Sequence, residues 1–135
     1  MNSQELAATL NNRQYRHEMT AQARSLAKEC GLVVVYGASD DLMEFSGAVE
    51  DEIGCFNGGK AYFTRDGLLV NDCDNDRCPH FAKLKAAATP IEAKWDTEGY
   101  AWVYETTIPH STFDIWEDGG KYCRGIVFSL ADVPV

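Results

Sequence analysis

The chain has 135 residues, of which 45% are hydrophobic and 24% charged, a balance that suits one globular domain spanning 1–135. Its 21 acidic and 12 basic residues give a net charge of -9, which disfavours direct binding to nucleic acid or to an anionic membrane. No apolar run approaches the roughly 20 residues that span a bilayer, and the start of the chain does not resemble a secretory signal. We therefore expect a cytoplasmic protein.

The N-terminal third of the chain predicts one helix and one buried strand. Residues 1–16 are polar and predict either a loose N-terminal arm or a helix. From residue 18 to residue 30, apolar residues recur at helical spacing, and Gly31 follows as a cap, so this segment predicts an amphipathic helix. The uninterrupted apolar run Leu32-Val-Val-Val-Tyr36 predicts a strand that is buried on both faces and lies centrally in the sheet.

The middle of the chain carries turn signals and the start of a second helix. Asn57-Gly-Gly59 predicts a hairpin between strands at 53–56 and 61–63, and Arg65-Asp-Gly67 predicts another between 61–63 and 68–70. Pro79 suits the first residue of a helix over 79–88, which Thr89-Pro90 would end.

The C-terminal third is rich in aromatic and β-branched residues and predicts further strands, with turns at 97–99, 108–110 and 117–120. The sequence thus predicts an α+β fold, in which a meander-like antiparallel sheet has two helices packed on it.

The segment 71–80 gathers two thiols, three carboxylates and an imidazole. Cys73, Cys78 and His80 could bind zinc, structurally or for hydrolysis, but structural zinc usually takes four ligands, grouped in close pairs. No second close pair exists, so a fourth ligand would have to come through the fold from Cys55, Cys123 or His110. The five cysteines, an odd and scattered set, otherwise suggest reduced thiols.

A calcium loop is a weaker interpretation of the same segment. Asp72, Asp74 and Asp76 match the first three ligand positions of an EF-hand, but Arg77 stands where glycine is expected and Lys83 where glutamate is required. The simplest alternative is a polar loop before the predicted helix, because carboxylates are favoured at a helix N-terminus.

A second acidic feature lies in the first half of the chain. Between Glu29 and Gly59 there is no lysine or arginine, while seven carboxylates occur. Such a field suits a basic protein surface, although a solvated acidic rim that aids solubility would show the same pattern. The candidate binding residues are Asp40, Asp41, Glu44, Glu50, Asp51 and Glu52, extended by Asp72, Asp74 and Asp76.

The sequence favours a non-enzymatic role. A nucleophilic cysteine needs a histidine within reach, and Cys78 beside His80 is the only local candidate. There is no glycine-rich phosphate loop and no dinucleotide fingerprint. A small-molecule module remains a third interpretation, with Trp95, Trp102 and Trp116 lining a pocket, although half-buried sheet positions also explain them.

Three parts of the chain carry a resemblance to other sequences, and they are Val33-Val-Val-Tyr-Gly-Ala-Ser-Asp-Asp-Leu-Met-Glu-Phe-Ser-Gly-Ala48, Asp72-Cys-Asp-Asn-Asp-Arg-Cys-Pro-His-Phe81, and Ile108-Pro-His-Ser-Thr-Phe113 with Tyr122-Cys-Arg-Gly-Ile-Val-Phe128. They resemble small hypothetical proteins of tailed phages and prophages. The resemblance implies a host cell cytoplasm and no catalytic residues. Phage accessory genes of this size often encode proteins that disable a host defence system.

The leading hypothesis is therefore a phage or prophage accessory protein that binds a basic surface of a host protein through its acidic face and inhibits host defence. The alternative is a small zinc protein built on Cys73, Cys78 and His80. The sequence leaves the oligomeric state open, a homo-oligomer included.

Overall fold

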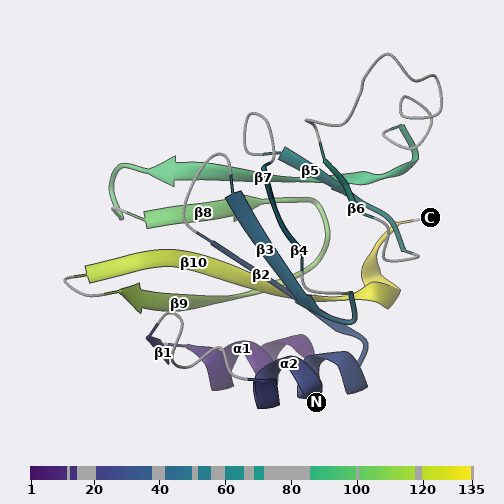
Figure 1. Cartoon of the computed structure of the whole chain (residues 1–135), viewed down its shortest axis with the longest axis horizontal. Helices are drawn as coiled ribbons and strands as arrows, with labels where there is room; N and C mark the ends of the chain where they lie inside the picture. The colour runs from purple at the N-terminus through teal and green to yellow at the C-terminus, as the bar shows by residue number, and fades with distance from the viewer. Residues whose placement is uncertain are drawn as a thin grey trace.

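The computed structural model describes residues 1–11, 13–14, 21–37, 42–49, 52–55, 60–65, 69–71, 86–99, 101–117 and 120–134. This part of the chain is mostly sheet, which curls strongly into a half-barrel and carries two short helices (Figure 1). The elements are α1 (Ser3–Leu10), β1 (Arg13–Gln14), α2 (Ala21–Glu29), β2 (Leu32–Tyr36), β3 (Leu42–Gly47), β4 (Glu52–Cys55), β5 (Lys60–Phe63), β6 (Leu69–Asn71), β7 (Thr89–Asp96), β8 (Ala101–Glu105), β9 (Ser111–Glu117), β10 (Gly120–Ser129) and the 3-10 helix η2 (Leu130–Asp132).

β10 is the strand at which the sheet divides. β9 pairs with it antiparallel over residues 120–127 and so occupies one of its edges. On the other edge, β8 pairs parallel at Cys123 and Arg124, and β2 pairs antiparallel from Ile126 to Ser129. Two branches therefore leave the same edge of β10: a β2 branch, of order β2-β3-β4, and a β8 branch, of order β8-β7-β5-β6.

An inner core fills the space between the two branches. Phe63 of the β8 branch stacks on Phe45 of the β2 branch, with ring centroids 6.2 Å apart, and meets Phe128 of β10 edge to face at 5.3 Å. Val33, Val35, Ile91 and Ile126 are buried in the same cluster. Aromatic contacts of this kind favour association beyond the area that they bury, so these rings hold the branches together.

A second, helix-side core lies on the opposite face of β2, β9 and β10, where α1 and α2 pack (Figure 1). All five residues of β2 are buried. Val33 and Val35 enter the inner core, whereas Leu32, Val34 and Tyr36 enter the helix-side core. The prediction of a strand buried on both faces is therefore confirmed.

The helices α1 and α2 both come from the first 30 positions. α1 begins with a capping box, in which the Asn2 side chain accepts from the Glu5 backbone N–H and the Glu5 carboxylate accepts from that of Asn2. Leu6, Ala7 and Leu10 are buried, so α1 is docked along one apolar stripe. α2 follows the predicted pattern and ends before Gly31, which has φ +67°.

α2 lies close to the sheet because small residues face each other there. Gly47 has φ +96°, and a Cβ at this position would lie 2.5 Å from the Leu32 carbonyl oxygen and 2.8 Å from the Ala27 Cβ. Only glycine accommodates both the backbone conformation and the approach of the helix.

The predicted meander-like antiparallel sheet is wrong. The sheet is mixed, because β8 runs parallel to β10 and β1 runs parallel to β9, and it curls into a half-barrel. The predicted hairpin across residues 57–59 is also wrong, since β4 pairs with β3 while β5 pairs with β6 and β7. A turn motif predicts that the chain changes direction, but it does not determine which strands pair with each other.

The remaining predictions concern a second hairpin, the C-terminal strands and a second helix. The hairpin across residues 65–67 is confirmed by the pairing of β5 with β6, and the C-terminal strands lie where they were expected. The helix predicted over 79–88 falls largely outside the described residues, but residues 86 and 87 are helical, and Thr89-Pro90, expected to end the helix, begins β7. The helices that pack in the helix-side core are α1 and α2.

We expect Gly125→Ala to destabilise the fold by about 1–3 kcal/mol, which is typical of overpacking in a core. Gly125 pairs with Phe113, whose ring covers it so closely that an added Cβ would overlap the ring. Urea unfolding measures the change. In the Phe113→Leu background the added methyl should cost much less, and an equal cost in both backgrounds would contradict the stated cause.

Truncation of Leu6 tests whether α1 contributes to the core. Leu6→Ala should lower the free energy of unfolding by about 2–5 kcal/mol, because its fully buried side chain would leave a cavity. Ala8→Ser, on the exposed side of the same helix, should cost about 0.5 kcal/mol or less. Equal urea midpoints for the two variants would mean that α1 contributes little.

Candidate functional site

Most residues of the predicted sites lie outside the described part of the chain. This holds for the predicted zinc ligands Cys73, Cys78 and His80, and for the acidic residues Asp40, Asp41, Glu50, Asp51, Asp72, Asp74 and Asp76. Their predicted roles stay predictions. Glu44 and Glu52 are the two predicted binding residues that fall in described strands, β3 and β4.

β3 and β4 are neighbouring strands, and each carries one of these two glutamates. Glu44 pairs with Ile53, and the next pair is Phe45 with Glu52, so the two glutamates occupy adjacent register positions. β4 is the last strand of the β2 branch in the sheet order of the described residues. Glu44 and Glu52 thus lie on the last two strands of this branch.

Of the three residues considered as a fourth zinc ligand, Cys55 is the last residue of β4, and the side chains of Cys123 and His110 are described. The Cys123 side chain is buried in the helix-side core, and the Nδ1 atom of His110 lies 2.7 Å from the carbonyl oxygen of Ile108 in the segment after β8. Within the described ranges, no group of three or more His, Cys, Asp and Glu side chains is arranged to hold a metal ion.

The outer face of the β8 branch, which is turned away from the inner core, carries pairs of oppositely charged side chains. The Lys60 Nζ lies 4.0 Å from a Glu92 carboxylate oxygen, and the Lys94 Nζ lies 2.9 Å from one of Glu105. Farther along, Arg124 donates to the Asp114 carboxylate at 3.0 Å. Each acidic residue of these pairs therefore has a cationic side chain within 4.0 Å.

This charged face was not predicted from the sequence. Its signal is the alternation in β7, where Ile91 and Ala93 are buried while Pro90 and Lys94 are exposed. Such alternation is typical of a strand with one solvated face.

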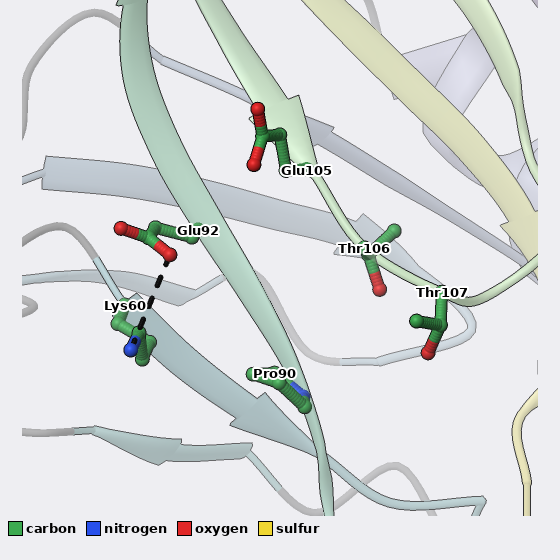
Figure 2. A pocket seen from close by; sticks show the side chains of 6 residues that line it. All are labelled: Lys60, Pro90, Glu92, Glu105, Thr106 and Thr107. Atoms are coloured by element: carbon green, nitrogen blue, oxygen red, sulfur yellow. Dashed lines mark ion pairs between the residues drawn. The ribbon is translucent and has the colours of Figure 1, made fainter.

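A hollow of about 350 Å³ opens on this face, and Figure 2 shows its lining side chains: Lys60, Pro90, Glu92, Glu105, Thr106 and Thr107. It forms because β8 ends at Glu105 while β7 continues back to Thr89. Pro90 has no N–H to offer a further strand at this point. After Glu105 the chain turns, and the Ile108 backbone N–H donates to the Thr106 hydroxyl at 3.3 Å.

Two carboxylates meet at this hollow. Glu92 and Glu105 are direct register partners on β7 and β8, and like charges directly opposite each other are unfavourable unless cations lie nearby. The pKa of Lys94 is raised above its usual value by the hydrogen bond to Glu105, by the charge of Glu105 and by the charge of Glu92. Both carboxylates thus act on one ammonium group.

The tryptophans suggested as pocket walls do not line this hollow. Trp95 and Trp102 are register partners whose rings meet edge to face at 5.5 Å. Trp95 is 48% exposed, whereas Trp102 packs against both cores. Trp102 therefore serves the packing of the fold.

Comparison with known proteins gives no relative: no family model, no curated protein and no solved structure matches the chain. In the part of the chain that the structure describes, no helix has the length and apolar character needed to cross a membrane.

The Lys94–Glu105 pair predicts a pH dependence. Because the folded-state pKa of Lys94 is raised above the usual 10.5, its contribution to stability is fully present below pH 10.5 and is lost as the pH rises through the folded-state value. The difference in urea midpoint between the wild type and Lys94→Gln should therefore be small but positive at neutral pH and shrink above pH 10.5. Added salt should reduce it too. A difference that grows at high pH would contradict this assignment.

Proposed function

We propose that the chain is a non-enzymatic binding protein that engages a basic surface of another protein through the acidic end of its β2 branch. The observation that carries this proposal is the segregation of charge along the chain. Residues 29–59, which include β2, β3 and β4, contain seven carboxylates and no lysine or arginine, so they contribute -7 of the net charge of -9. The remaining 14 acidic and 12 basic residues nearly balance.

The two branches differ accordingly in how their charge is arranged. In the β8 branch, Glu92 and Glu105 each lie near a lysine. In the β2 branch, Glu44 and Glu52 occupy neighbouring register positions within a segment that has no cation of its own. A field of one sign attracts a partner of the opposite sign, speeds its association and disfavours partners of like charge.

The resemblance to phage and prophage proteins supplies the context of the proposal. A host protein that binds nucleic acid has a basic surface, and an acidic protein that occupies this surface competes with the nucleic acid. Inhibition of a host defence enzyme by such competition is the role that we propose.

A pair of charge reversals tests the proposed surface. The bait Glu44→Lys/Glu52→Lys should retain a host protein from bacterial lysate at least about tenfold less well than the wild type, because removal of complementary charges slows association. The bait Glu98→Lys/Asp132→Lys changes the net charge equally at exposed positions outside β3 and β4, and it should bind like the wild type. Binding to the wild-type bait should also weaken with increasing salt.

The proposal fails if the retained protein binds the two reversed baits equally, because net charge alone would then explain the binding. Retention that is insensitive to salt would contradict it as well. Circular dichroism of each bait verifies that the substitutions leave the fold intact.

A further inference from the structure

The hollow on the β8 branch has the geometry of a socket for one cationic side chain. We propose that it binds the guanidinium group of an arginine, presented by a peptide or protein, between the carboxylates of Glu92 and Glu105. This site lies on a different branch from β3 and β4 and does not depend on the function proposed above.

The register of Glu92 and Glu105 suits recognition of a guanidinium ion. Glu92 and Glu105 are direct cross-strand partners, and such partners have Cβ atoms about 4.5–5.5 Å apart. A guanidinium ion is planar and has five N–H donors in a fixed fork, so it can donate to two carboxylates at once. An ammonium group is a compact point charge and bridges such a pair less well.

The resident lysines leave this place open to a further cation. Lys94 approaches Glu105 from two residues farther along β7 and does not line the hollow. Lys60 lines the hollow, but its Nζ is 4.0 Å from Glu92, at the outer limit of an ion pair. Figure 2 shows Lys60 and Glu92 to one side of the β7 ribbon, with Thr106 and Thr107 to the other. With two glutamates and one lysine, the lining carries a net charge of -1.

The remaining walls match the rest of an arginine side chain. The Pro90 ring, the methylene stem of Lys60 and the threonine methyl groups offer carbon surface to the three methylenes of arginine. The Thr107 hydroxyl oxygen can accept a further N–H. A volume of about 350 Å³ holds one side chain and its headgroup, but not a folded segment.

The raised pKa of Lys94 agrees with a cation-binding field at these two carboxylates. It is raised by the charge of Glu92 as well as by that of Glu105. The two carboxylates therefore act together on a positive charge beside β7.

The test is a titration of the isotope-labelled full chain with N-acetyl-L-arginine amide, followed by two-dimensional NMR. We expect saturable shifts at Lys60, Glu92, Glu105, Thr106 and Thr107, with a Kd of roughly millimolar order, as suits one exposed ionic contact. The citrulline analogue, which keeps the shape and lacks the charge, should give no saturable shift. The lysine analogue should bind more weakly than arginine.

Matched variants locate the site. Glu92→Gln/Glu105→Gln should raise the Kd at least about tenfold, because both charge-assisted acceptors are lost. Glu98→Gln/Asp132→Asn removes the same net charge elsewhere on the surface and should leave the Kd unchanged. Unperturbed spectra of both variants away from the substitutions verify folding.

Three results would overturn the proposal: equal binding of the citrulline analogue, equal loss of affinity in the two variants, or shifts that scatter over acidic residues outside the hollow. None of them bears on the β3–β4 surface, whose reversed baits keep Glu92 and Glu105.

Discussion

The edge of β10 that β8 and β2 share is the constraint on which the rest of the structure depends. One strand has only two edges, and β9 takes one of them over residues 120–127. β8 and β2 must therefore follow each other along the second edge, and the sheet divides where one ends and the other begins. Because the branches then face each other, Phe45, Phe63 and Phe128 can meet in one core.

Both candidate surfaces follow from this division. Each branch turns one face toward the inner core, so the outer face of the β8 branch is exposed and carries charged residues. β8 ends at Glu105, and beyond it Pro90 of β7 has no N–H to donate to a further strand. On the β2 branch the helices pack against the outer face of β2, and Glu44 and Glu52 lie on β3 and β4. Charge is thus displayed on the face of one branch and at the end of the other.

The sequence predicts elements whose signal is local. α2, the fully buried β2, the β5–β6 hairpin and the C-terminal strands could be predicted from periodicity and turn residues. Strand partners could not be predicted, because pairs such as Val33 with Phe128 lie far apart in the chain. The hollow was missed for the same reason: Glu92 and Glu105 are unremarkable until β7 and β8 place them opposite each other. The expected acidic site is represented in the described residues by Glu44 and Glu52 alone.

The docking of α1 has a consequence for the order in which the chain can fold. Leu6 and Leu10, near the start, are buried against Phe113, Ile115 and Val127, near the end. During synthesis the first helix has no surface to cover until the last strands leave the ribosome. Native contacts between the two ends of a chain are slow to form, so the apolar stripe of α1 stays exposed until they do. A chain truncated before β10 would lack Ile126 and Phe128 in the inner core and Cys123 and Val127 in the helix-side core.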